Sequence, residues 1–303
     1  MKTITSTLFI LCLSFSAIAT VYYVAPNGKG KALSWAEASG DLNAVLFAAS
    51  RGDEIWVAEG TYFPTEFTDR TISFVIGSGI KVYGGFRGNE TAENQRDWKN
   101  NITILSGAIG KAIVEDNSHT VVYMKNANKE TVLNGFVIES GCANSESMPR
   151  TAPKCGGGLF NDGSGERGNS TPAITNCTFR YNYGRNGGAV YNDGTGGNAS
   201  PFFTNCIFEN NRTDLDGGAV FNDGRRNGKS NPVFDFCAFN NNEGNYGGAM
   251  LNYGGAGESI PTLNACTFEN NESYIDGAIF YNVTTEGTAY PQINDLMREI
   301  NKP

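Results

Sequence analysis

Two acidic residues and a short basic cluster have the side-chain types that enzymes use to cleave polysaccharides. Asp214 and Asp216 lie two residues apart in RTDLDGG, and most glycoside hydrolases require a pair of carboxyl groups. A lyase instead needs a basic residue to remove a proton, usually beside a bound cation. The basic candidates are Arg225, Arg226 and Lys229 in NDGRRNGKSNP. Both groups are also typical of solvated loops, which is the interpretation we favour.

The remaining candidates for acid–base or metal chemistry have simpler explanations. His119 is the only histidine, and we interpret it as a hydrogen-bonded structural residue. Three NDG triplets begin at Asn161, Asn192 and Asn222. Calcium at these loops is a minor alternative, because turn chemistry already accounts for Asn, Asp and Gly there. The cysteine spacing lacks the paired ligands of a zinc site. The sequence therefore predicts no cofactor.

The spacing of these residues comes from an internal repeat. The ladder cysteines, Cys177, Cys206, Cys237 and Cys266, lie 29, 31 and 29 residues apart. A phenylalanine follows each cysteine by two positions, giving Phe179, Phe208, Phe239 and Phe268. An asparagine follows each phenylalanine by three positions, giving Asn182, Asn211, Asn242 and Asn271. A repeat of this period indicates a stack of similar structural units.

Each repeat predicts short strands separated by fixed turns. Cys177 and Phe179 would share one face of a strand, whereas the pattern leaves open whether Val190 alone, or Ala189 with Tyr191, faces inward on a second strand. No helical period appears between residues 156 and 290. The repeats therefore predict an all-β, parallel β-solenoid with one coil per repeat. Stacked coils would align the cysteines, phenylalanines and asparagines as ladders, with a second asparagine ladder at Asn161, Asn192, Asn222 and Asn252.

The repeats resemble those of the polymorphic outer membrane proteins. The segments FRYN, FENN, FNNN and FENN are each followed by GGAV, GGAV, GGAM or DGAI, similar to the paired FxxN and GGA[ILV] motifs of that family. YYVAPNGKG, GDEIWVAEGTYFPT, KVYGGFRGNE and NITILSG resemble a wider group of secreted bacterial β-helix proteins. The resemblance extends over about residues 21–290. It implies a single-stranded, right-handed parallel β-helix of the pectin-lyase-like type, located at the cell surface or outside the cell.

The N-terminal residues and the charge agree with export. Residues 1–19 combine a lysine, an apolar run and small residues before position 20, the pattern of a signal peptide. No other stretch is long and apolar enough for a membrane-spanning helix. The net charge of −8 argues against a nucleic-acid partner. We expect an extracellular or outer-surface location.

The pattern divides the exported chain into three parts. Residues 20–130 are expected to form a cap and irregular first coils, residues 131–290 about five regular coils, and residues 291–303 a second cap or a truncated coil. Residues 41–50 predict a capping helix that begins after Asp41. Its Ala44, Val45, Phe47 and Ala48 are expected to cover the open end of the stack, and residues 54–62 to form the first strand.

Cys142 and Cys155 differ from the ladder cysteines because they flank an insertion, ANSESMPRTAPK. In an oxidising compartment they are expected to form a disulfide, worth about 3 kcal/mol for a loop of this length. The alternatives are that both thiols stay reduced or that ladder cysteines pair with each other.

Binding is the function that this pattern favours. Four polar loops, residues 161–172, 192–201, 222–232 and 252–261, are expected to emerge on one side of a rigid stack, where binding residues are commonly found. Tyr181, Tyr183, Tyr246 and Tyr274 in the opposite turns would add aromatic contacts or pack at the rim. The sequence thus predicts non-catalytic adhesion to an extracellular glycan or protein. The alternative is a polysaccharide lyase or glycoside hydrolase with its site in a groove along the helix.

Overall fold

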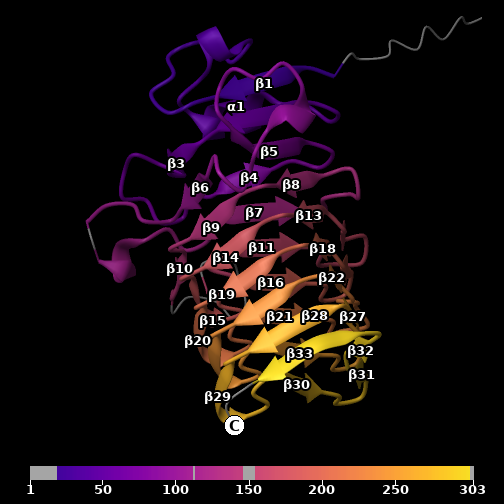
Figure 1. Cartoon of the computed structure of the whole chain (residues 1–303). Helices are drawn as coiled ribbons and strands as arrows, with labels where there is room; N and C mark the ends of the chain where they lie inside the picture. The colour runs from indigo at the N-terminus through magenta and orange to yellow at the C-terminus, as the bar shows by residue number, and fades with distance from the viewer. Residues whose placement is uncertain (1–18, 112, 146–153, 301–303) are drawn as a thin grey trace, which may run out of the picture.

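The chain folds as a parallel β-helix with its coils stacked along one axis (Figure 1). This computed structural model describes residues 19–111, 113–145 and 154–300, so all but the last residue of the expected signal peptide, residues 1–19, lies outside it. Every strand pair is parallel and in register over most of its length, and Val190↔Val220 and Asn192↔Asn222 are examples. The fold predicted from the repeats is confirmed.

Four sheets run along the stack, and we name them A to D. Sheet A contains β1 (Val21–Val24), β2 (Glu54–Ala58), β5 (Lys81–Phe86), β8 (Val132–Asn134), β13 (Ala173–Thr175), β18 (Phe202–Thr204), β22 (Val233–Asp235), β27 (Thr262–Asn264) and β32 (Gln292–Ile293). Sheet B contains β3 (Gly60–Tyr62), β6 (Thr103–Ser106), β9 (Val137–Glu139), β14 (Thr178–Arg180), β19 (Ile207–Glu209), β23 (Ala238–Asn240), β28 (Cys266–Glu269) and β33 (Leu296–Ile300).

The other two sheets complete each coil. Sheet C contains β4 (Phe74–Ile76), β7 (Val122–Lys125), β11 (Leu159–Asp162), β16 (Val190–Asp193), β21 (Val220–Asp223), β25 (Met250–Tyr253) and β30 (Phe280–Val283). Sheet D contains β10 (Cys142–Ala143), β15 (Tyr183–Asn186), β20 (Arg212–Asp216), β24 (Glu243–Tyr246) and β29 (Glu272–Asp276). A regular coil therefore runs through sheets A, B, D and C before a loop leads to the next coil.

Short elements complete the chain. Two small ladders pair β12 (Asn169–Ser170) with β17 (Asn198–Ala199) and β26 (Glu258–Ser259) with β31 (Thr288–Ala289). The helical elements are α1 (Leu42–Ala48) and the 3-10 turns η1 (Trp35–Glu37), η2 (Glu93–Gln95) and η3 (Val114–Asp116). No helix in the described part of the chain is long and apolar enough to cross a bilayer.

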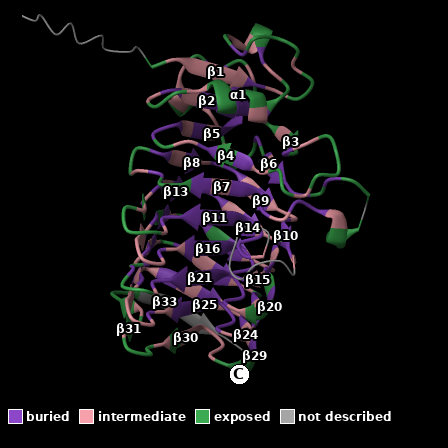
Figure 2. Ribbon diagram, turned by 180° about the vertical axis from the view of Figure 1, so that it is seen from behind, coloured by how far each residue is buried: buried purple, intermediate pink, exposed green. Residues whose placement is uncertain are grey.

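Stacked side chains fill the interior, which Figure 2 shows as buried strands surrounded by exposed loops. The rings of Phe179, Phe208, Phe239 and Phe268 stack with centroids 5.2, 4.7 and 4.8 Å apart. The four ladder cysteines beside them are buried, and burial raises the pKa of the Cys177 thiol to about 12. These thiols therefore act as small apolar core groups rather than as nucleophiles.

Two asparagine ladders satisfy polar groups inside the stack. In the first, each Nδ2 donates to the Oδ1 of the next coil, with distances of 3.2, 3.0 and 2.9 Å along Asn182, Asn211, Asn242 and Asn271. In the second, Asn161, Asn192, Asn222 and Asn252 are joined by bonds of 3.3, 2.9 and 2.9 Å. Because a buried amide without partners is costly, these ladders fix the register of neighbouring coils.

The glycine pair between sheets D and C makes a corner that other residues could not form. Gly187 has φ 61°, and a Cβ there would lie 2.3 Å from the carbonyl oxygen of Val190. After this corner Val190 faces the main core, whereas Tyr191 is buried on the other face of sheet C with Phe160 and Phe221. Both faces of β16 are therefore packed, which explains why alternation did not identify the inward residue.

The N-terminal cap differs in detail from the expectation. Asp41 caps α1 by accepting a 2.9 Å hydrogen bond from Ala44 N, but the helix buries Leu42, Val45 and Leu46. Phe47 is 94% exposed, and Ala44 and Ala48 are exposed as well. The expectation that these three residues cover the stack was wrong, because the helix packs on β1 and β4 through its leucines.

The expected first strand also required correction, whereas the C-terminal residues continue two of the sheets. β1 precedes the expected first strand and pairs with β2, while residues 54–62 divide into β2 and β3, which belong to different sheets. At the other end, β32 and β33 continue sheets A and B. Backbone pairing therefore extends the coil stack to Ile300, although Leu296 replaces the repeated cysteine.

Candidate functional site

The loops that follow β11, β16, β21 and β25 form one stacked surface, which we call the loop face. Backbone hydrogen bonds connect successive loops, including Gly165 N to Thr195 O and Gly196 N to Arg225 O, each 2.9 Å long. The backbone pairing that begins with β12 and β17 continues into the next two loops. There Lys229 forms one bridge to Asn198 and a second to Glu258. The Gly- and Asn-rich loops are thus part of the hydrogen-bonded stack, and the loop face is a rigid, polar surface.

Some residues at the tips of these loops have backbone conformations that favour glycine. Arg226 is exposed and has φ 57°, and the residues at the same position in adjacent coils are Gly196 (φ 66°) and Ala256 (φ 50°). A non-glycine residue in this region is uncommon and is enriched at functional sites. Arg226 therefore projects a positive charge from a position where neighbouring coils have almost no side chain.

A column of three carboxylates lies at the base of the loop face. Asp162, Asp193 and Asp223 are the last residues of β11, β16 and β21 and are adjacent in register. Lys125 precedes them in the column and Tyr253 follows. Like charges in such a column repel unless each receives its own partners.

The negative charge of Asp162, the first carboxylate of the column, is stabilised by several hydrogen-bond donors and a cation. Asp162 accepts hydrogen bonds from Tyr123 Oη at 2.8 Å and Ser164 Oγ at 2.7 Å, and Lys125 Nζ lies 3.0 Å away. Burial is the largest single influence and acts to raise its pKa, but these hydrogen bonds together hold the pKa of Asp162 below its ordinary value.

The third carboxylate has comparable partners. Asp223 accepts a 2.5 Å hydrogen bond from Tyr191 Oη and one of 2.7 Å from Arg225 Nε. The Arg225 guanidinium also lies 4.8 Å from the ring centroid of Tyr253. Arg225 is therefore committed to a structural ion pair.

The middle carboxylate, Asp193, lacks the tyrosine donor that each neighbouring carboxylate has, although the Thr195 side chain does hydrogen-bond to it. The residue corresponding to Tyr123 and Tyr191 on the preceding coil is Phe160, which has no hydroxyl group to donate to Asp193. Thr195 provides a hydrogen bond from its backbone N at 3.1 Å. Burial, with the negative charges of Asp223 and Asp162, raises the pKa of Asp193 to about 6. The column thus contains one carboxyl group that titrates near neutral pH.

The structure does not bring the predicted catalytic residues together. Asp214 and Asp216 belong to β20 and precede β21, whereas Arg225, Arg226 and Lys229 follow the other end of β21. Asp214 accepts a hydrogen bond from the Tyr183 hydroxyl group, and Lys229 Nζ lies 3.6 Å from Glu258 Oε1. The contacts of Asp214 and Lys229 are thus with residues of adjacent coils.

Three of the four tyrosines expected in the opposite turns, Tyr183, Tyr246 and Tyr274, lie on strands of sheet D, and two of these three form hydrogen-bonded side-chain pairs. Tyr183 pairs with Asp214, and the Tyr274 hydroxyl donates to Glu243 Oε2 at 2.9 Å. Tyr246 packs with Tyr281 at a centroid distance of 4.7 Å, and Tyr181 is 61% exposed. Most of these rings therefore support the rim.

The predicted disulfide is absent, and the register explains why. Cys142 is the partner of Tyr183 and Cys155 is the partner of Asn186, both on β15. Three residues along a strand span about 10 Å, but the Cα atoms of a disulfide lie at most about 7 Å apart. The prediction that Cys142 and Cys155 are joined was therefore wrong. Residues 146–153 of the insertion between them lie outside the described residues.

His119 has the structural surroundings that we predicted. Its Nδ1 lies 3.2 Å from the carbonyl oxygen of Cys142. Burial, assisted by the positive charge of Arg70, lowers the pKa of His119. Arg70 itself donates to Asn117 O at 2.7 Å and Asn144 Oδ1 at 2.7 Å, so this cluster ties three loops together.

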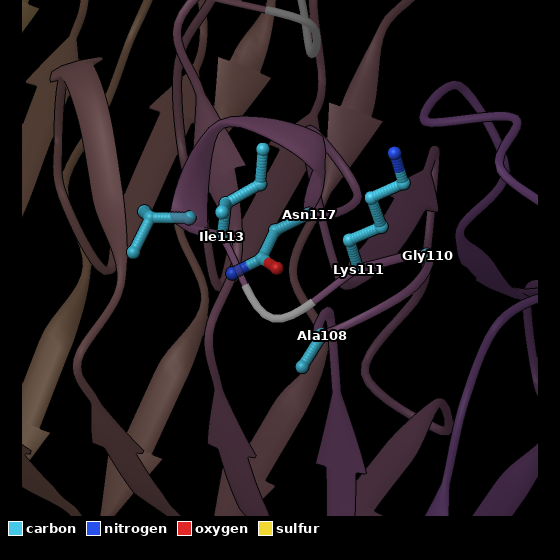
Figure 3. Close-up of a pocket in the computed structure, with 6 residues that line it drawn as sticks. Ala108, Gly110, Lys111, Ile113 and Asn117 are labelled. Carbon is cyan, nitrogen blue, oxygen red and sulfur yellow. The ribbon is translucent and has the colours of Figure 1, made fainter.

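A hollow of about 360 Å³ lies over the loop between β6 and β7 (Figure 3). Its six lining residues are Ala108, Gly110, Lys111, Ile113, Val114 and Asn117. Lys111 alone of these six carries a charge, so no carboxylate pair lines the hollow in the described part of the chain.

Sequence reasoning missed the carboxylate column, although its signal was present. The segments LFND, AVYND and AVFND place an aromatic residue two positions before each aspartate. Alignment of the coils would have revealed the tyrosine-to-aspartate pairs and the exception at Phe160. The triplets were interpreted only as turns.

A comparison with family models supports the repeat in one segment, and two solved structures are similar to most of the chain at low identity. A model of the Chlamydia polymorphic membrane protein repeat matches residues 205–223. Escherichia coli YbhC is 12% identical with a TM-score of 0.41, and the match covers 90% of this chain and 73% of that chain. Pectate lyase Pel9A is 14% identical with a TM-score of 0.36, covering 90% of this chain and 82% of that chain. No curated protein matches the sequence. The expected resemblance to the polymorphic membrane protein repeat is therefore confirmed over that segment.

Proposed function

We propose that this protein is an exported surface protein that recognises an extracellular glycan or protein through its loop face, without catalysis. The observation that supports this proposal most is the stacking of the loops by backbone hydrogen bonds. A preorganised surface loses little conformational entropy when it binds, and exposed polar side chains such as Arg226 supply contacts.

The surface location is supported by the repeat match at residues 205–223 and by the signal-peptide pattern of residues 1–19. The carbohydrate-active alternative has weaker support, because Asp214 and Asp216 are separated from Arg225 and Arg226 by the length of β21.

A binding screen tests the proposal directly. The chain without residues 1–19 is applied to arrays of glycans and of extracellular proteins, and each hit is measured again with Arg226→Ala. Alanine is accommodated at this position in the next coil, where Ala256 has φ 50°. We expect Arg226→Ala to weaken binding about fivefold or more, as the loss of a charged contact would. The control Arg87→Ala removes an exposed arginine outside the loop face and should leave affinity unchanged.

The catalytic alternative is tested on acidic and neutral polysaccharides, with and without calcium. Reducing ends and the ultraviolet absorbance of unsaturated uronates are followed. Cleavage that is abolished by Asp214→Asn or Arg226→Ala would overturn the non-catalytic proposal.

A further inference from the structure

A second concave surface lies at the N-terminal end of the stack, away from the loop face. This cleft has a volume of about 1010 Å³, and it is bounded by residues 26–30, residues 39–43 and the segment that follows β3. Pockets for drug-sized ligands have volumes of about 300–1,000 Å³, so the cleft is large enough for an extended ligand. The segments that form it are at the top of Figure 1.

One side of the cleft displays apolar side chains to solvent. Phe67 is 77% exposed, Phe63 is 48% exposed, and Ile72 is 37% exposed, and all three line the cleft. The segment that carries them is held in place: Asn43 Nδ2 donates to Pro64 O at 2.6 Å, and Phe67 N donates to Thr65 Oγ1 at 3.1 Å. Clustered exposed apolar side chains on a fixed segment indicate a binding surface.

The opposite side is polar and made largely of backbone. Lys29 and Ser39 form an antiparallel bridge, and Gly30 N donates to Ala38 O at 2.9 Å. A Cβ on Gly30 would lie 2.2 Å from Glu37 O, so glycine permits the close contact of these two segments. The lining of the cleft therefore includes both exposed rings and fixed peptide groups.

The charges of the cleft narrow the class of ligand. Asp41 and Glu66 contribute two carboxylates and Lys29 one ammonium group to the lining, in a chain whose net charge is −8. This balance disfavours anionic ligands such as uronates, phospholipids or nucleic acids. One carboxylate oxygen of Asp41, Oδ1, already accepts the hydrogen bond from Ala44 N that caps α1.

We propose that this cleft binds a short stretch of a neutral oligosaccharide. A pyranose ring has an apolar C–H face, which matches Phe63 and Phe67, and hydroxyl groups around its edge, which match Asn27, Ser39 and the peptide groups of the other wall. The site is distinct from the loop face.

Calorimetric titration with neutral hexasaccharides of glucose, mannose, xylose and N-acetylglucosamine tests the inference, with hexagalacturonate as the anionic comparison. We expect at least one neutral hexasaccharide to bind and hexagalacturonate to bind more weakly or not at all. Phe67→Ala should raise the Kd about tenfold, because a stacked ring loses its contact. Phe63→Ala should act in the same direction.

Phe47→Ala is a matched control, because Phe47 is 94% exposed on α1 but does not line the cleft. It should leave the Kd within twofold of the wild type, and circular dichroism should be the same for all three variants. Failure of every neutral hexasaccharide to bind would overturn the inference, as would equal effects of Phe67→Ala and Phe47→Ala. Binding that is lost in Arg226→Ala but kept in Phe67→Ala would also overturn it, while supporting the loop face.

Discussion

The hydroxyl group of Tyr191 on β16 donates a 2.5 Å hydrogen bond to Asp223 on the next coil, and both side chains are fully buried. Tyr123 and Asp162 repeat the relationship two coils earlier at 2.8 Å. On the coil between them, Phe160 occupies the position from which a tyrosine hydroxyl group would donate a hydrogen bond to Asp193. The hydrogen-bond partners of the carboxylate column thus depend on which aromatic residue precedes each aspartate.

Phe160→Tyr should supply the missing donor. Phe160 stacks between Tyr123 and Tyr191, with interplanar angles of 20° and 15°, so a new hydroxyl group would extend in nearly the same direction as theirs. We expect the pKa of Asp193 to fall and the free energy of unfolding at pH 7 to rise by about 1 kcal/mol. Carbon-13 NMR titration of the carboxyl groups and urea unfolding measure the two effects.

The control for that change is Phe221→Tyr, since the next coil presents Tyr253 at the corresponding position instead of an aspartate. It should give no stabilisation. An equal gain from both variants would mean that the added hydroxyl group acts without Asp193.

The raised pKa of Asp193 predicts a fall in stability as the pH rises. The folded state holds the proton up to a pH of about 6, whereas an unfolded aspartate releases it near pH 4. The stabilisation is therefore complete below about pH 4 and is lost as the pH rises to about 6, amounting to about 3 kcal/mol. Denaturant unfolding of the wild type and Asp193→Asn should differ in slope over this range, and parallel profiles would contradict the assignment.

Tyr191→Phe should destabilise the protein by about 1–3 kcal/mol, because Asp223 would lose a buried hydrogen-bond donor. Thermal unfolding measures the change. Tyr290→Phe is the control, since Tyr290 is 52% exposed, and its Tm should not change. A Tyr191→Phe variant as stable as the wild type would show that Arg225 alone compensates the carboxylate.

Asn211→Ala should lower the free energy of unfolding further, by about 3 kcal/mol or more. The reason is that the buried side chain of Asn211 hydrogen-bonds across three coils. Its Nδ2 donates to Phe179 O at 2.9 Å and Asn242 Oδ1 at 3.0 Å, and its Oδ1 accepts from Asn182. Each buried group left without a partner costs about 1–3 kcal/mol. The exposed Asn294, which bonds to Asn264 at 2.7 Å, provides Asn294→Ala as a comparison that should cost under 1 kcal/mol in urea unfolding.

Reducing agent should leave the Tm of the purified protein unchanged, because Cys142 and Cys155 are not joined. A disulfide closing this span would contribute about 3 kcal/mol, which corresponds to a shift of several degrees. Differential scanning calorimetry with and without dithiothreitol distinguishes the two cases, and Cys142→Ser provides a variant in which that bond cannot form.

The sequence alone determined the repeat, the parallel stacking and the residues that form ladders. This was possible because each coil contacts mainly its neighbours, so a period near 30 residues translates directly into which side chains meet. The aligned Phe179 and Phe208, and the aligned Asn182 and Asn211, follow from spacing in this way. The cap of α1 was predictable for a similar reason, since Asp41 acts within its own first turn.

Only the tertiary structure decided features that depend on how sheets C and D meet and how irregular segments cross the stack. The sequence does not give the register that separates Cys142 from Cys155, because the insertion between them obeys no repeat. Burial on both faces of β16 hid the role of Tyr191, and the pKa of Asp193 depends on Phe160 from another coil. The N-terminal cleft likewise arises where three segments distant in sequence pack together, a contact that no local pattern encodes.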